Sequence, residues 1–197
     1  MDNNLTSQKC TACGTAVSSY DGVYLSDGDI RSFLCSKCYN ESISKAIGLN
    51  FDHLSFHPVV LPDTDGVNHT FHFQTRLFGD KVHIQALEII KGGPKGYKFS
   101  VHGEAEDDLF GLFEKLVNRM RRELERRHIE ASDLTRYRIT NEDVVRGHIT
   151  RDNDIDGAVP CLVIDGKELS WDEFGIMMMA YEGFHFKLEI FEGTEER

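Results

Sequence analysis

The chain has 197 residues, 40% of them hydrophobic, and a formal net charge of −11. This length supports one ordinary domain with a hydrophobic core and a small appended module. The charge disfavours non-specific nucleic-acid binding, because an acidic protein repels phosphate backbones at long range. No apolar run reaches the ~18 residues of a membrane span, and the polar start "MDNNLTSQK" does not resemble a secretory signal. We therefore expect a cytosolic protein without a membrane partner.

Four of the five cysteines form two CxxC pairs, Cys10 with Cys13 and Cys35 with Cys38. Thiols stay reduced in the cytosol, which disfavours disulfides. Two CxxC pairs can aim four sulfurs at one ion, and closed four-cysteine sites are typical of structural zinc. The sequence therefore predicts one structural zinc ion with these four ligands.

The residues around the two pairs predict a small zinc module. "GVYLSDGDIRSFL" predicts a β-hairpin that turns at "SDGD", and "YNESISKAIG" predicts a short helix that ends at Gly48. Gly14 follows the first pair, where a tight turn around a metal favours a positive φ. A knuckle, a hairpin and ligands at the start of a helix resemble a treble-clef zinc finger over residues 8–48.

Residues 55–103 predict an antiparallel meander with one buried face. Its strands are "FHPVVL", "HTFHFQTRLF", "KVHIQALEII" and "YKFSVHG", in which apolar side chains alternate with polar ones. Gly79–Asp80 suits a hairpin turn, and "KGGPKG" predicts a loop. The apolar period then changes and predicts an amphipathic helix over residues 105–128, with Arg126 and Arg127 in its last turn.

The last third predicts a polar connector at residues 130–143, a strand at "VVRGHIT" and a hairpin that turns at Asp165–Gly166. Ser170 and Glu173 form a capping box for a second helix. That helix is expected to bury Trp171, Phe174, Met177, Met178 and Tyr181. A final strand, "FHFKLEIF", is expected to point Phe184, Phe186, Leu188 and Ile190 inward.

These elements predict an α+β fold: a zinc-binding module at residues 1–50, then an α+β domain at 51–197. The larger domain would hold an antiparallel sheet with two main helices on one face. The stretch from "VRGHIT" through "PCLVIDGKELSWDEFGIMMMAYEGFHFKLEI" resembles a group of bacterial proteins that carry an N-terminal double-CxxC module. The resemblance implies this architecture and a bacterial cytosolic setting. It implies no catalytic residues.

Four histidines fall opposite the apolar residues of the predicted strands: His72, His83, His102 and His185. Together they would form a polar sheet face that binds a second metal or an anion, or supplies an acid–base pair. The alternative is a solvated face of mixed charge.

Three further motifs have structural as well as functional interpretations. "RMRRELERR", Arg119 to Arg127, is either a nucleic-acid-binding face or a solvated helix face in which Glu123 can pair with Arg127. "DNDIDG", Asp152 to Gly157, imitates the start of a calcium loop but lacks the glutamate at position 12. Cys161 has no nucleophile motif around it and is expected to be a buried thiol.

We therefore expect a binding protein with a structural zinc ion, whose target is a protein partner or a second copy. The first alternative is a nucleic-acid-associated protein that uses the zinc module and the Arg119–Arg127 face. The second is a hydrolase-type enzyme on the histidine face. The sequence nominates no catalytic residue, and a nucleotide-binding glycine loop is not among its motifs.

Overall fold

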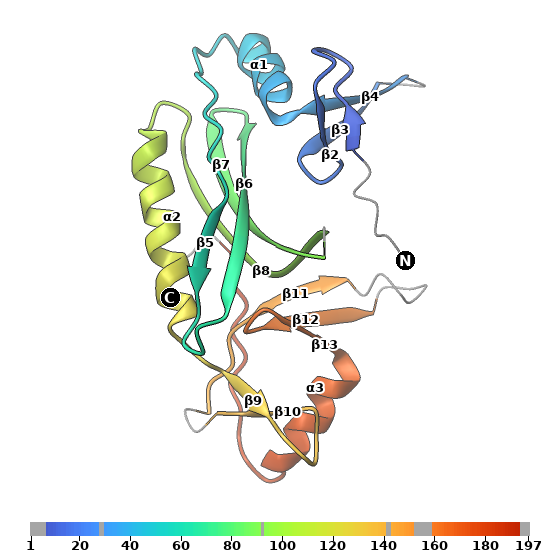
Figure 1. Ribbon diagram of the computed structural model, residues 1–197, viewed down its shortest axis with the longest axis vertical. Helices are drawn as coiled ribbons and strands as arrows, with labels where there is room; N and C mark the ends of the chain where they lie inside the picture. Colours follow the sequence, from blue (N-terminus) through green and yellow to red (C-terminus); the bar gives the residue numbers. More distant parts are fainter. Residues whose placement is uncertain (1–6, 28–29, 92, 141–142, 152–158, 194–197) are drawn as a thin grey trace.

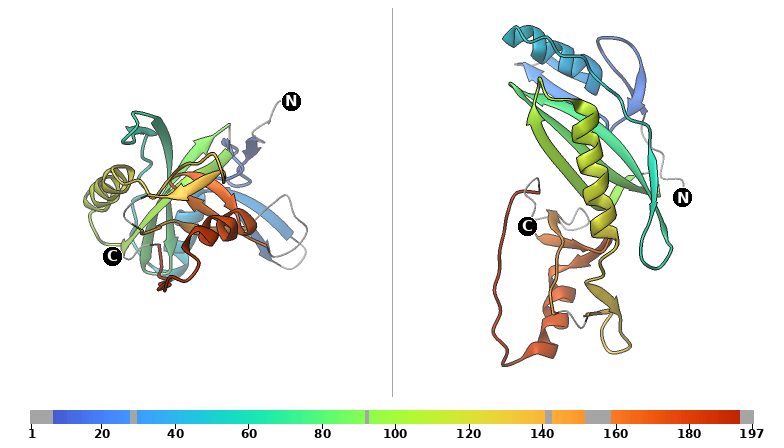
Figure 2. Two further views of the ribbon diagram at one scale, coloured as in Figure 1. Left: turned by 90° about the horizontal axis from the view of Figure 1, so that it is seen from below. Right: turned by 90° about the vertical axis from the view of Figure 1, so that its left-hand side faces the viewer.

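The computed structural model describes residues 7–27, 30–91, 93–140, 143–151 and 159–193. Figure 1 shows three parts stacked along the long axis of the molecule, and the right-hand view of Figure 2 shows the same order from another side. We call them the metal module (residues 7–50), the central sheet with its helix (51–127) and the C-terminal unit (128–193). The combination of antiparallel strands and helices is an α+β fold, as predicted.

The metal module contains two hairpins and a helix. Strands β1 (Ser7–Lys9) and β2 (Ala16–Ser18) pair antiparallel, as do β3 (Gly22–Asp27) and β4 (Ile30–Cys35), and helix α1 spans Ser36–Ile47. Gly48 ends α1 with a φ of 70°, in the left-handed region that favours glycine. The predicted hairpin and helix are thus confirmed, and the β1–β2 hairpin is additional.

The central sheet is an antiparallel meander in the order β5-β6-β7-β8. Its strands are β5 (Val59–Pro62), β6 (Asn68–Phe78), β7 (Lys81–Ile90) and β8 (Gly93–Glu104). Helix α2 (Leu109–Leu124) covers one face and buries its apolar side against the inward residues of the strands (Figure 1). The predicted "KGGPKG" loop is shorter than expected, because Gly93 and Pro94 already pair with β7.

Helix α2 is shorter at both ends than the predicted span of 105–128. It begins after Asp108, whose carboxylate accepts a hydrogen bond from the backbone N–H of Phe110 as an N-cap. Beyond its end, the N–H groups of His128 and Ile129 both donate to the Asp165 carboxylate, at 2.7 and 2.8 Å. Asp165 lies 36 positions after Ile129, so a contact between residues distant in sequence fixes the backbone just beyond the end of α2.

The C-terminal unit holds two small sheets and a short helix. Strands β9 (Ile129–Ala131) and β10 (Tyr137–Ile139) pair, so the predicted connector contains a hairpin. Strands β11 (His148–Arg151), β12 (Pro160–Ile164) and β13 (Lys167–Ser170) form the second sheet, and α3 (Trp171–Met178) continues into the 3₁₀ helix η1 (Met179–Tyr181). The predicted Asp165–Gly166 turn and the Ser170–Glu173 capping box are both present.

Two expectations for this unit are wrong. Helix α3 packs on β10, β12 and β13 rather than beside α2, so the two helices do not share one face of one sheet. Residues 184–191 do not join a sheet, and Phe184, Phe186, Leu188 and Ile190 are exposed. Without that strand to cover it, α3 buries only Met177 fully, and Trp171 is 50% exposed.

A buried amide joins the metal module to the central sheet. Strand β5 pairs with β6 only as far as Phe71, which leaves the rest of that edge of β6 to other partners. Asn40 of α1 is fully buried there; its Nδ2 donates to the carbonyl of Thr75 at 2.8 Å, and its Oδ1 accepts from the N–H of Leu77 at 2.9 Å. The side chain of Asn40 therefore pairs with the edge of β6 as a neighbouring strand would. No helix in the described part of the chain combines the length and apolar character of a membrane span.

The substitution Asn40→Ala is expected to lower the free energy of unfolding by roughly 2–6 kcal/mol, because two buried backbone groups lose their partner at about 1–3 kcal/mol each. Urea denaturation of the metal-loaded protein measures the loss. Asn118→Ala, which removes an exposed amide from α2, is the matched control. Equal losses in the two variants would show that the pairing of Asn40 with β6 contributes nothing.

Candidate metal centre

The first CxxC pair lies in the turn between β1 and β2. The N–H of Cys10 donates to the carbonyl of Thr15, and the N–H of Gly14 donates to the carbonyl of Cys10, both at 2.9 Å. Gly14 has a φ of 74°, as its place after the pair predicts. These backbone bonds tighten the turn, so Cys10 and Cys13 point to the same side.

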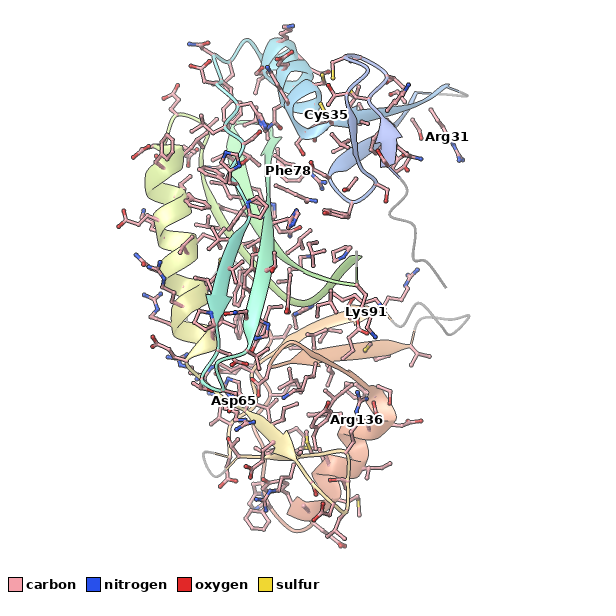
Figure 3. All side chains as sticks on the ribbon, in the orientation of Figure 1. Arg31, Cys35, Asp65, Phe78, Lys91 and Arg136 are labelled. Carbon is pink, nitrogen blue, oxygen red and sulfur yellow. The ribbon has the colours of Figure 1, made fainter. Side chains whose placement is uncertain are left out.

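The second pair lies where β4 meets α1. Cys35 is the N-cap of α1 and Cys38 lies in the first turn (Figure 3 labels Cys35). The N-terminus of a helix carries a partial positive charge, which favours thiolate over thiol, but burial outweighs it here and raises the pKa of both Cys35 and Cys38. The strand-to-helix junction thus presents both sulfurs of the pair to the knuckle formed by the first pair.

The four sulfurs meet in one cluster. The Sγ atoms of Cys10, Cys13, Cys35 and Cys38 lie within 4.8 Å of one another, and all five cysteines of the chain are free thiols. Four sulfurs about 2.3 Å from a zinc ion in a tetrahedron would be about 3.8 Å apart. Cys13 and Cys35 have their Sγ atoms 3.9 Å apart, far beyond a disulfide bond. The cluster therefore fits one tetrahedral, thiophilic metal ion.

The environment of the sulfurs separates their pKa values. Burial opposes ionisation of Cys10, but the backbone groups of Cys35, Cys13 and Ala12 hydrogen-bond its sulfur and lower its pKa to about 6. Burial raises the pKa of Cys38, and the neighbouring cysteine sulfurs raise it further. Four sulfurs this close cannot all ionise without a compensating cation, which is the condition that a bound metal ion satisfies.

A groove of about 550 Å³ lies between the metal module and β6. Its walls carry charged and polar side chains of both signs, among them Asp21, Lys37, Glu41, His53 and His72. His53 Nδ1 lies 2.8 Å from Nδ2 of Asn40, and burial lowers the pKa of this histidine. The mixed charge of the walls favours no single class of ligand.

The four histidines predicted to share a face are only partly brought together. His83 and His102 are cross-strand neighbours with ring centroids 4.5 Å apart. Burial, with His102, Lys98 and Arg76 nearby, lowers the pKa of His83 to about 4. His72 lies beside Tyr20 of the metal module, 3.4 Å from its hydroxyl. His185 lies in the exposed segment after η1, so it does not belong to the sheet face.

Much of the predicted solvated face is covered by the metal module. Gln74 donates to the carbonyl of Tyr20, and Arg76 donates to the carbonyls of Tyr20 and Gly22 at 3.3 and 3.2 Å. Asp21 lies close to Arg76, and burial raises the pKa of Asp21 even though the arginine opposes that shift. The polar residues at this end of β6 therefore hydrogen-bond the central sheet to the metal module.

A partly buried histidine that was not among the predicted site residues, His69, lies between two carboxylates. Nδ1 of His69 is 2.6 Å from Glu88 and Nε2 is 3.2 Å from Asp63. Glu88 also accepts from the N–H of Tyr97, at 2.8 Å. The hydrogen bond to Glu88 raises the pKa of His69, burial opposes it, and Asp63 adds to the rise. A sequence signal existed: His69 and Glu88 occupy the inward, apolar register of their strands.

Three arginines of the Arg119–Arg127 stretch contact other groups of the protein. Arg119 donates to the carbonyls of Gly193 and Ser100, at 2.8 and 3.3 Å. Arg126 pairs with Glu123 at 3.0 Å, so the expected pairing of Glu123 with Arg127 is replaced. Arg127 pairs instead with Asp65, at 2.7 Å (Figure 3 labels Asp65).

Cys161 is buried, as predicted, and its thiol lies 3.2 Å from the carbonyl of Leu169. The calcium-like motif, residues 152–157, lies outside the described residues. The four cysteines are thus the one metal-type cluster that the described residues assemble.

The pH dependence of stability tests the His69 cluster. A raised pKa means that its stabilisation is fully present below the ordinary value of 6.5 and is lost as pH rises through the folded-state pKa. Between about pH 6 and about pH 9 we expect a larger fall in the free energy of unfolding for the native chain than for His69→Gln. His57→Gln, which changes an exposed histidine outside the cluster, is the control. Identical pH profiles for all three proteins would contradict this account.

Comparison with known proteins matches three domain families to successive parts of the chain. Residues 9–50 match the domain of unknown function DUF7685, residues 52–125 match DUF7686, and residues 128–195 match DUF7713. No curated protein and no solved structure matches the chain. The three matched segments correspond to the metal module, the central sheet with α2, and the C-terminal unit, and they assign no activity to any of them.

Proposed function

We propose that this is a zinc-stabilised binding protein, with the ion in a structural role and a protein as its target. The closed four-cysteine cluster carries the proposal, because four protein ligands complete the tetrahedral coordination of zinc and leave no position for water or substrate. Catalytic zinc sites keep such a position open. The knuckle, the β3–β4 hairpin and the ligands at the start of α1 support a treble-clef zinc finger.

The distribution of exposed apolar residues supports a protein partner. Eleven of the seventeen exposed large hydrophobic residues in the described chain lie between residues 134 and 191. They include Leu134 at 97% exposure, and Ile176 and Met179 on α3 and η1. Concentrated apolar surface of this kind is typical of interaction sites. We therefore place the binding surface on the C-terminal unit and regard the metal module as its distant structural support.

Nucleic acid is the alternative partner. The contacts of Arg119, Arg126 and Arg127 with protein groups favour the protein-binding proposal, because each contact competes with a phosphate for the same guanidinium. A hydrolase-type site on the sheet face is the second alternative. This alternative has less support, because the predicted histidines do not form one site: His83 and His102 are neighbours, but His185 lies in the segment after η1. A second metal ion per chain would favour it.

We also propose a bacterial cytoplasmic setting, in which reduced thiols remain available to the metal. The division at residue 50 is proposed as the boundary of the module. Asn40 makes that boundary an interface with buried polar contacts.

The proposed zinc ion predicts one zinc per chain in the freshly reduced protein, measured by elemental analysis. Cys35→Ser should release it, because three sulfurs bind zinc more weakly than four. Cys161→Ser, the same chemical change at the cysteine outside the cluster, should keep the full zinc content. Protein without any thiophilic metal, or equal metal loss in both variants, would contradict the proposed site.

Nucleic-acid binding should be weak, with a Kd of roughly 10 µM or more at ~150 mM salt, because the arginines offer few phosphate contacts and the chain is acidic. A salt titration with mixed-sequence duplex DNA and single-stranded RNA measures it. Sub-micromolar binding that is abolished when Arg119, Arg122 and Arg126 are all changed to Glu would make nucleic acid the partner instead.

A further inference from the structure

The segment after η1 is an extended stretch with the alternation of a strand and no sheet to join. Figure 2 shows it running along one side of the C-terminal unit. Phe186, Leu188 and Ile190 are 91%, 73% and 74% exposed. His185, Lys187 and Glu189 alternate with them, and Nζ of Lys187 lies 2.5 Å from Glu189, as same-side neighbours in an extended chain do. The segment therefore has one apolar and one mostly polar side.

Both ends of the segment are fixed to the rest of the protein. At its start, Gly183 has a φ of 87° and the N–H of Phe184 donates to the carbonyl of Tyr181 at 3.0 Å. At its end, Arg119 of α2 holds the carbonyl of Gly193. Between them, within the described part of the chain, the backbone of residues 185–190 pairs with no strand. An extended, anchored backbone with open edges is a template for another strand, and little ordering entropy remains to be lost on pairing.

We propose that residues 186–190 pair antiparallel with the same residues of a second copy, around a two-fold axis at Leu188. This inference rests on the proposed binding function and names its partner. In this register Leu188 faces its own counterpart and Phe186 faces Ile190, so the apolar sides coincide. Lys187 faces Glu189 of the second copy, and the symmetry forms this pair twice.

Neighbouring registers are less favourable. Centring the pair on Lys187 sets two lysines opposite each other, and centring it on Glu189 sets two glutamates opposite each other. Like charges directly opposite destabilise a sheet. A slip by one residue places the apolar side of one strand beside the polar side of the other. The charge pattern of the segment thus selects one self-complementary register, and this favours a second copy over an unrelated strand as the partner.

A dimer needs more than the two strands. A two-stranded ribbon alone is marginal in water, and a stable interface buries roughly 1,200 Å² or more, so further apolar surface must be covered. The C-terminal unit carries such surface: Ile176 of α3 and Met179 of η1 are 57% and 66% exposed.

Charge exchange at positions 187 and 189 tests the pairing, with mass measured by light scattering across a concentration series. The native chain should be a dimer. Lys187→Glu and Glu189→Lys should each raise the dimer dissociation constant about tenfold or more, because two opposite-charge pairs become like-charge pairs. The double variant should recover the native value. Lys115→Glu, an exposed change of equal charge on α2, should leave the dimer intact.

Mixing the two single variants separates pairing between chains from the ion pair within one chain. Both single variants lack the internal Lys187–Glu189 pair, but a mixed dimer restores opposite charges at both cross-strand positions. Native mass spectrometry should show more heterodimer than homodimer. Three outcomes would each overturn the proposal: a monomeric native chain, a dimer dissociation constant that the single substitutions leave unchanged, or no preference for the heterodimer. A monomer that still holds one zinc would overturn the pairing alone and leave the zinc site of the proposed function standing.

Discussion

The hydrogen bonds of Asn40 connect the metal centre to the largest hydrophobic core of the protein. Its amide occupies the place of a missing strand along the edge of β6, between Thr75 and Leu77. The amide of Asn40 can make these bonds only if α1 is held in place. Two of the four cysteines lie at the start of this helix: Cys35 is its N-cap, and Cys38 is two residues before Asn40. A metal ion bound by the four cysteines would therefore be coupled to the sheet through one helix, and it would stabilise more of the protein than the module alone.

The metal module also covers the polar end of β6 through a second set of contacts. Gln74 and Arg76 direct their donors at carbonyls of the Tyr20–Gly22 turn, and Asp21 partly balances the arginine. Ser36 of α1 donates to the carbonyl of Asp21 at 2.8 Å, so the turn is tied to the helix as well. A buried polar interface of this kind specifies one arrangement of two parts, because any shift leaves donors or acceptors without partners.

What the sequence predicted well depends on local chemistry. The positive φ of Gly14, the Asp165–Gly166 turn, the capping box of Ser170 and the meander each follow from a few adjacent residues, and the structure shows all of them. The clustering of the cysteines was also predictable, since one ion can satisfy only four such ligands. The contact of His69 with Glu88 and the role of Asn40 were not, because these contacts join residues 19 and 35 positions apart. The alternation of residues 184–191 predicted a strand that the structure does not form, because periodicity cannot say whether a neighbouring strand lies beside the segment.

Hydrogen exchange at the backbone amide of Leu77, with and without metal, measures the coupling most directly. This amide donates to Asn40, and its protection depends on α1 staying in place. Removing the metal with a chelator should accelerate exchange at Leu77 and leave the amide of Ile84, in the inner strand β7, protected. Unchanged protection of Leu77 in metal-free protein would contradict the account, because the edge of β6 would then be held without the metal centre.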